Sequence, residues 1–246
     1  MDPQKRAATE RKYRLPYHWM RDPHEREALP YFGYVSLALS LLPRASRVLD
    51  AGCGDGRVTA ALVEAGHAAS GVELVEHQLH YARCLVPEAS FHHADLRRPL
   101  DEQTPLEPEG FDACLCLEVY EHVPPDEAGR VLDTLRRALA SGGLLVLSAP
   151  SKRLPVSSLH YRHFDLPELK AEVESHGFRV ETVIRQHRLT PAARWLMGPV
   201  VEGLIRNAYV RLPVLERLRA RVYRKWFNHV AGDRPAGRYL LAARKS

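Results

Sequence analysis

Short apolar segments alternate with amphipathic segments over residues 46–188, and this alternation constrains the fold more than any other feature of the chain. Such a pattern is typical of parallel strands joined by helices that cover both faces of a sheet. The sequence predicts seven strands, at residues 46–50, 68–74, 89–94, 111–117, 144–149, 178–187 and 237–245. Five alternating units followed by two closing strands predict an α/β fold with a doubly wound, Rossmann-like sheet.

Turn and cap residues mark the ends of two predicted elements. Gly142 and Gly143 predict a turn that introduces the fifth strand. Asp165 is expected to cap the following helix, because Glu168 three residues later would complete a capping box. Gly177 predicts the end of that helix.

The glycine-rich segment VLDAGCGDG, residues 48–56, joins the first strand to a helix. Gly52, Gly54 and Gly56 predict a tight turn whose backbone is open to a ligand. The segment has Arg57 where a dinucleotide fingerprint has its third glycine, and no Gly-Lys-Ser/Thr follows as in a P-loop. Asp50 would repel a pyrophosphate and attract an ammonium or a sulfonium. We therefore expect a cationic nucleoside ligand, and S-adenosylmethionine fits that description.

Two further acids stand at the ends of predicted strands. Glu73 lies 21 residues after Gly52, a spacing at which an acid can accept hydrogen bonds from ribose hydroxyls. Asp95, in the segment HHADL, could accept from an adenine amino group, with the backbone of Leu96 sharing the contact. The alternatives are a solvated strand-end charge for Glu73 and a turn or helix cap for Asp95.

Glu118, Glu121 and His122 follow the fourth strand at positions i, i+3 and i+4. On one helical turn they would share a face, at the sheet edge where α/β proteins bind ligands. One interpretation makes His122 a general base, because an imidazole titrates near neutral pH. Another has Glu118, Glu121 and His122 bind a hard divalent cation such as Mg²⁺. The third is a structural helix turn without chemistry.

A second histidine cluster, HYRHFD at residues 160–165, follows the fifth strand. His160 and His163 could supply another base or a fourth metal ligand, because the loop opens at the carboxyl end of a strand. Capping of the next helix is the structural alternative.

The segments VLDAGCGDG, GVEL, HADL and FDACLCLEVYEHVP, in this order and spacing, resemble the motifs of class I S-adenosylmethionine-dependent methyltransferases. Within that class they are similar to the subgroup that includes ubiquinone-biosynthesis O-methyltransferases, over about residues 46–187. The resemblance implies the strand order 3-2-1-4-5-7-6, with the seventh strand antiparallel.

The same resemblance implies a role for each motif. Asp50 and the loop 52–56 would hold the methionine part of the cofactor, Glu73 the ribose, and Asp95 with Leu96 the adenine. Leu74 and Leu117, at two strand ends, complete the expected cofactor site. The pattern ExxEH also resembles the metal-binding motif of ubiquinone-pathway O-methyltransferases and of small-RNA 3′-terminal 2′-O-methyltransferases.

Two segments lie outside the predicted core. We expect residues 1–45 to form an N-terminal helical cap and residues 46–246 the methyltransferase domain, with residues 188–236 as a helical, lid-like insertion. Basic and apolar residues over 204–228 predict an amphipathic helix that contacts an anionic membrane or substrate. The alternative is that this helix packs on the domain with its arginines solvated.

These features predict O-methylation of a small-molecule or lipid-linked metabolite. RNA 2′-O-methylation, N-methylation of an amino sugar, and cofactor binding without turnover are the alternatives. The net charge of +5 is compatible with RNA, but no stacking platform of interleaved aromatic and basic residues is evident. The N-terminus has no secretion-signal pattern and no apolar run is long enough to span a membrane, so we expect a cytoplasmic protein, with peripheral contact at the inner membrane surface as an extension.

Overall fold

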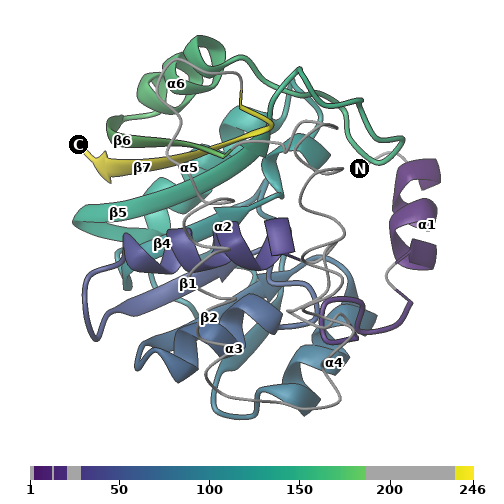
Figure 1. Ribbon diagram of the computed structural model, residues 1–246. Coiled ribbons are helices and arrows are strands. Elements are labelled where there is room, and N and C mark those ends of the chain that lie inside the picture. Colours follow the sequence, from purple (N-terminus) through teal and green to yellow (C-terminus); the bar gives the residue numbers. More distant parts are fainter. Residues whose placement is uncertain (1–2, 13, 21–28, 187–235) are drawn as a thin grey trace, which may run out of the picture.

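The strands form one seven-stranded mixed sheet in the computed structural model, which describes residues 3–12, 14–20, 29–186 and 236–246 (Figure 1). The strands are β1 (Arg47–Ala51), β2 (Ala68–Glu73), β3 (Ser90–His93), β4 (Phe111–Leu117), β5 (Leu139–Pro150), β6 (Phe178–Gln186) and β7 (Arg238–Lys245). Their order is β3-β2-β1-β4-β5-β7-β6. Neighbouring strands from β3 to β5 pair in parallel, whereas β7 is antiparallel to both β5 and β6. This topology confirms the expected fold class and strand order.

Helices cover both faces of the sheet. They are α1 (Pro3–Lys12), α2 (Leu29–Ser40), α3 (Arg57–Glu64), α4 (Glu76–Leu85), α5 (Ala128–Ala138) and α6 (Leu166–Ser175), with short 3₁₀ turns η1 (Leu100–Glu102) and η2 (Tyr120–His122). Alternate residues of each strand point to opposite faces. Accordingly Val48 and Leu115 pack in the cluster formed with α2 and α3, while Leu49 and Cys114 pack in the cluster formed with α5 and α6.

The cap and turn predictions had different outcomes. Asp165 and Glu168 form the expected capping box, and Gly177 adopts a φ of 75° just beyond the end of α6. The predicted turn at Gly142 and Gly143 is wrong, because both glycines lie within β5, which begins at Leu139. Gly142 has a φ of 68°, and the partners of Phe111 and Ala113 are Leu139 and Leu144, so the two glycines form an irregularity within the strand and not a turn before it.

The topology brings the functional segments to one edge of the sheet. The parallel strands β1, β2, β4 and β5 end there, and the antiparallel β7 begins there. Loops after parallel strands therefore converge on one crevice, which is where ligands bind in open α/β sheets.

Two predicted segments fall outside this description. The lid-like insertion at 188–236 lies outside the described residues except for Ala236, as does the whole of the amphipathic segment 204–228. Contact of that segment with a membrane therefore stays a prediction. Within the described residues, no helix is both long and apolar enough to cross a membrane.

Candidate active site

The glycine-rich loop after β1 lies against the loop that follows β4. The amide of Gly52 donates to the Val72 carbonyl of β2 at 2.8 Å, and Gly52 has a φ of 79°. A Cβ atom at this position would lie 2.4 Å from a methyl carbon of Val119. Only glycine allows both the backbone conformation and this approach.

Gly54 and Gly56 have different surroundings. Gly54 has a φ of 54° and lines the pocket beside the loop. Gly56 precedes α3, and a Cβ atom there would lie 3.1 Å from the Cα atom of Ala82 in α4. Gly56 therefore serves the packing of two helices and does not line the pocket.

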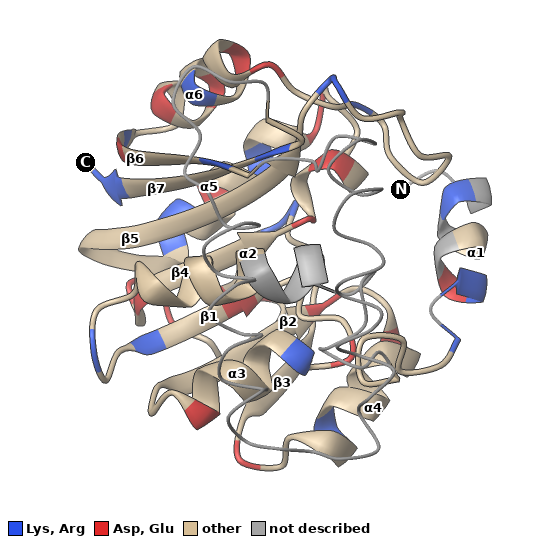
Figure 2. Cartoon of the chain, viewed as in Figure 1, with Lys and Arg blue, Asp and Glu red and all other residues tan. Residues whose placement is uncertain are grey.

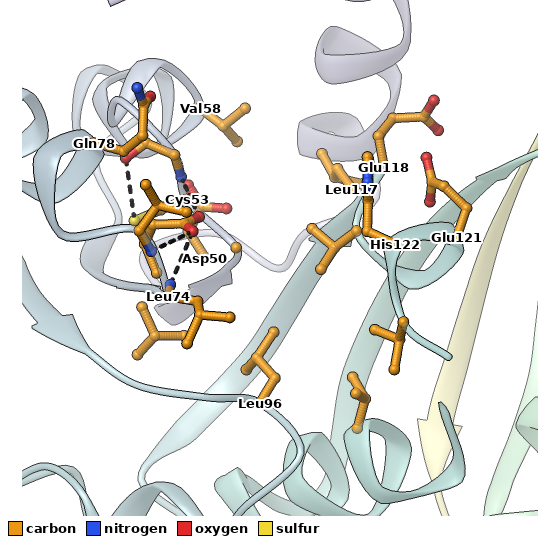
Figure 3. Close-up of a pocket in the computed structure, with 18 of the residues that line it drawn as sticks. Asp50, Cys53, Val58, Leu74, Gln78, Leu96, Leu117, Glu118, Glu121 and His122 are labelled. Carbon is orange, nitrogen blue, oxygen red and sulfur yellow. Dashed lines mark hydrogen bonds between the residues drawn. The ribbon is translucent and has the colours of Figure 1, made fainter. Parts of the chain in front are cut away.

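A pocket of about 370 Å³ opens between these loops. Figure 3 shows Asp50, Cys53 and Leu74 on one side of it and Glu118, Glu121 and His122 on the other. The residues predicted from sequence that line it are Asp50, Gly52, Gly54, Glu73, Leu74, Asp95, Leu96, Leu117, Glu118, Glu121 and His122. His163 does not line it, although His160 does.

Glu73 ties the glycine-rich loop to the end of β2. One carboxylate oxygen accepts from the amides of Leu74 and Val75 at 2.9 and 3.0 Å, and the other accepts from the amide of Gly54 at 3.1 Å. Burial raises the pKa of Glu73, and the three backbone hydrogen bonds oppose this rise. The oxygen bonded to Gly54 keeps a lone pair that can accept from a ligand hydroxyl.

Asp50 lies at the carboxyl end of β1 with only 3% of its surface exposed. It accepts a hydrogen bond of 2.6 Å from the hydroxyl of Thr59. Burial raises the pKa of Asp50 to about 7, and the charge of Glu73 adds to the rise. A positively charged ligand group beside Asp50 would favour its ionised form.

Asp95 is bound by a neighbouring arginine. Its carboxylate accepts from the side chain of Arg97 at 2.8 and 3.1 Å and from the Arg97 amide at 3.0 Å. Burial alone would raise the pKa of Asp95, but the hydrogen bonds from Arg97 lower it. Asp95 therefore lines the pocket, as expected, and also binds Arg97. The contact with Arg97 was not predicted from the sequence.

This wall of the pocket suits the expected cofactor. The carboxylates of Asp50, which is buried, and Glu73, which is half-buried, can receive an ammonium and ribose hydroxyls, and a Cβ atom at Gly52 would fill the space between the loops. Leu74 and Leu96 supply apolar surface for a nucleobase. The residues present therefore fit S-adenosylmethionine.

Glu118 lies on the pocket wall opposite the glycine-rich loop, and its backbone conformation was not predicted from the sequence. It has a φ of 57°, in the left-handed region, and only Tyr120–His122 forms a 3₁₀ turn. The prediction of a single helical turn from Glu118 to His122 is therefore wrong. The carboxylate of Glu118 pairs with Arg238 at 2.7 Å and accepts from the Ser148 hydroxyl at 2.9 Å. These partners are the physical reason for the departure, because they draw Glu118 toward β5 and β7.

The pKa values of Glu118 and Glu121 shift in opposite directions. Burial alone would raise the pKa of Glu118, but the charge and hydrogen bond of Arg238 lower it. Glu121 is fully buried, and neither of its carboxylate oxygens has a hydrogen-bond partner among the described residues. Burial and then the charge of Glu118 raise the pKa of Glu121. Arg238 thus favours the ionised form of Glu118, whereas burial favours the neutral form of Glu121.

His122 and His160 lie edge to face beside Glu121, with ring centres 4.6 Å apart. Burial lowers the pKa of each to about 4, so both rings are neutral near pH 7. Donor atoms of Glu121, His122 and His160 lie within 4.8 Å of one another. This group differs from the predicted metal set, since His160 takes the place of Glu118.

Arg238 is a site residue that the sequence analysis missed. Besides pairing with Glu118, its guanidinium lies 4.4 Å from the ring centre of Tyr34 and donates to the Gln186 side chain at 2.9 Å. The sequence does contain a sign of this role, because Arg238 is a charged residue at the start of the otherwise apolar segment RYLLAA. Only the antiparallel insertion of β7 places that end of the strand at the pocket.

Residues 14–20, which precede α2, are bound to the glycine-rich loop through Asp55, which is fully buried. Its carboxylate accepts from the His18 amide at 2.8 Å and contacts the His18 ring at 3.1 Å, and its carbonyl accepts from the Trp19 indole at 2.8 Å. His18 lines the pocket, whereas Trp19 packs on the cluster around α4. These contacts hold the segment against the glycine-rich loop beside the pocket.

Comparisons with known proteins agree with this geometry. A family model described as a methyltransferase domain matches residues 49–147. The ubiquinone biosynthesis O-methyltransferase of Xanthomonas axonopodis pv. citri (strain 306) is 32% identical over 167 residues, which cover 61% of this chain and 69% of that protein.

Solved structures share the fold. A TehB-like S-adenosylmethionine-dependent methyltransferase from Corynebacterium glutamicum is 18% identical, with a TM-score of 0.61 and full coverage of both chains. The 1,6-didemethyltoxoflavin-N1-methyltransferase of Burkholderia thailandensis, solved with S-adenosylhomocysteine, is 21% identical, with a TM-score of 0.61 over 100% of this chain and 91% of that chain.

The raised pKa of Asp50 predicts that affinity for S-adenosylhomocysteine depends on pH. Because the ligand's ammonium favours the ionised carboxylate, binding should release a proton below pH 7, where free Asp50 is protonated. The dissociation constant, measured by calorimetry between pH 5.5 and 8.5, should rise by up to about tenfold per unit below pH 7 and level off above it. Asp50→Asn should bind weakly and without this dependence, while Asp126→Asn, at an exposed acid, should retain it. A flat profile for the unaltered chain would contradict the assignment.

Proposed function

The chain belongs to the class I S-adenosylmethionine-dependent methyltransferases, the family that includes the ubiquinone biosynthesis O-methyltransferases, and we propose that it methylates an oxygen atom of a small-molecule or lipid-linked acceptor. One observation carries the proposal: two neutral imidazoles, His122 and His160, stand on the pocket wall that faces the glycine-rich loop. A hydroxyl acceptor has to lose its proton as it is methylated, and a neutral imidazole can accept that proton.

The cofactor supplies an electrophilic methyl group attached to a positively charged sulfur. Asp50, Gly52 and Gly54 would hold its amino-acid part, Glu73 its ribose, and Asp95 with Leu96 its adenine. Leu74 and Leu117 would pack against it. These residues would fix the position of the methyl group, and the opposite wall would position the acceptor oxygen.

In the proposed reaction, the acceptor oxygen forms a bond to the methyl carbon while the carbon–sulfur bond breaks and sulfur keeps the electron pair. The hydroxyl proton passes to the imidazole of His122. With a pKa of about 4, His122 is always ready to accept a proton near pH 7 but is a weak base. Much of the rate enhancement would then come from alignment of the two reactants, which alone can contribute several kcal/mol.

A divalent cation is a second way to activate the hydroxyl, and the unpartnered carboxylate of Glu121 favours it. Glu121, His122 and His160 would hold the ion, because their donor atoms lie within 4.8 Å of one another. The earlier expectation used Glu118, which is engaged by Arg238. Two nitrogens and one oxygen suit Zn²⁺ or Mn²⁺ better than Mg²⁺, which prefers oxygen ligands. Such an ion would polarise the hydroxyl and lower its pKa.

The acceptor class predicts where a labelled methyl group will appear. Purified protein incubated with methyl-labelled S-adenosylmethionine and fractionated cell extract should transfer label to the small-molecule or lipid fraction. The product should be a methyl ether, identified by mass spectrometry. Label in RNA or on an amine would replace the proposed acceptor by one of the alternatives, and absence of transfer to every fraction would favour cofactor binding without turnover.

Removal of the His122 imidazole should impair chemistry and leave cofactor binding intact. We expect His122→Ala to lower kcat by about 10²-fold or more, because a general base or a metal ligand is lost. The dissociation constant for S-adenosylhomocysteine should change by less than about twofold. His80→Ala serves as the matched control, since His80 is exposed on α4 and outside the pocket. Full kcat in His122→Ala would refute both catalytic interpretations.

Chelation distinguishes the base from the cation. If the ion is required, dialysis against a chelator should reduce kcat at least about tenfold, and Mn²⁺ or Zn²⁺ should restore it better than Mg²⁺. Calorimetric titration of the chelated protein with Mn²⁺ should show one site that is lost in His160→Ala. Unchanged turnover in chelator would leave His122 as base and remove the cation.

A further inference from the structure

Three histidines meet where the loop after β5 packs on η2, and two of them form a directed chain of hydrogen bonds. Nδ1 of His163 lies 3.0 Å from the Leu154 carbonyl, and Nε2 of His163 lies 2.8 Å from Nδ1 of His160. His163 is 4% exposed and stands behind His160, which lines the pocket. His163 therefore contacts the pocket only through another residue.

The chemistry of these groups fixes the direction of each hydrogen bond. In a neutral imidazole one ring nitrogen donates and the other accepts. The Leu154 carbonyl can only accept, so Nδ1 of His163 carries the hydrogen and its Nε2 is the acceptor. Nδ1 of His160 is then the donor. The unprotonated nitrogen of His160 is consequently Nε2.

We infer that His163 is a positioning residue, which holds His160 in the tautomer whose Nε2 has a free lone pair. The inference rests on the proposed function, in which His160 acts as a proton acceptor or a cation ligand. Both roles require an unprotonated ring nitrogen, and the hydrogen bond made by the other nitrogen decides which one is available. The sequence pattern favours a direct role for His163 as a base or ligand, whereas its position behind His160 gives it an indirect one.

His122 is oriented by the same loop. Its Nδ1 lies 3.3 Å from the Leu159 carbonyl, so this nitrogen is the donor and Nε2 of His122 is also unprotonated. The two carbonyls, of Leu154 and Leu159, thus set the tautomers of both pocket histidines, one directly and one through His163. One ring nitrogen of each histidine and a carboxylate oxygen of Glu121 lie within 4.8 Å of one another.

The backbone of the loop is held on both sides, which keeps these carbonyls in place. The amide of Tyr161 donates to the Glu121 carbonyl at 2.8 Å. Lys5 of α1 donates to the carbonyls of Ser158 and His160 at 2.7 and 2.9 Å, and its ammonium lies 4.7 Å from the ring centre of Tyr161. Figure 2 shows basic residues along α1, the helix that supplies this lysine.

The test combines two substitutions with a direct view of the ring nitrogens. His163→Leu removes both the donor and the acceptor, whereas His163→Gln restores one of each in a side-chain amide. Long-range ¹H–¹⁵N spectra of the histidine-labelled full chain report which nitrogen of each ring is protonated, and the His160 signals are assigned with His160→Gln. His176→Leu is the matched control, because His176 bonds to Asp133 and does not line the pocket.

We expect the unaltered chain and His163→Gln to show His160 protonated at Nδ1, and His163→Leu to shift it toward the form protonated at Nε2. The kcat of His163→Leu should fall about 10- to 100-fold, that of His163→Gln should stay within about threefold, and affinity for S-adenosylhomocysteine should be unchanged in both. His160 protonated at Nε2 in the unaltered chain would overturn the inference, as would equal losses of kcat in both variants. The spectra need no turnover, so a chain with the expected tautomer but no O-methylation would refute the proposed function alone.

Discussion

The two walls of the site depend on the close approach of Gly52 to Val119. No side chain can separate the loop after β1 from the loop after β4, because even a Cβ atom would lie 2.4 Å from the valine. The contact therefore fixes the distance between the wall that carries Asp50 and Glu73 and the wall that carries His122 and His160. A reaction in which a group passes directly between two ligands needs such a fixed distance, since misplacement of either ligand by about 1 Å can cost a hundredfold in rate.

Around this contact, the pocket concentrates carboxyl groups and controls the charge of each. Arg238 keeps Glu118 ionised, whereas burial favours the neutral form of Glu121, and Asp50 is close to balance near pH 7. Burying several ionised acids together would be costly. The site reduces this cost with one arginine, one acid whose burial favours the neutral form and one acid that can ionise when a cation arrives. A positively charged donor beside Asp50 would thus meet a wall that acquires its charge on binding.

The sequence predicted the parts of this arrangement that depend on local order. Strand periodicity, the glycine spacing and the Asp165–Glu168 cap were visible because each involves residues close together in the chain. The ion pair of Glu118 with Arg238 spans 120 residues, and it is one reason why the expected helical turn does not form. The indirect place of His163 was also missed, because it depends on how the loop after β5 packs. The contact of Asp95 with Arg97 was missed although the two residues are close in the chain, because residue spacing does not determine side-chain direction. Sequence patterns therefore located the site, whereas the contacts between its side chains could be seen only in the folded structure.

The insertion of β7 between β5 and β6 has a consequence for synthesis of the chain on the ribosome. In the sheet of described residues β6 pairs only with β7, yet residues 187–237 are made between the two strands. At about 5 to 20 residues per second, this leaves the nascent chain for several seconds with β6 unpaired and the β5 edge open. Exposed strand edges invite wrong pairing and aggregation. The interval in which the nascent chain is most exposed to wrong strand pairing therefore comes after most strands of the sheet have been made.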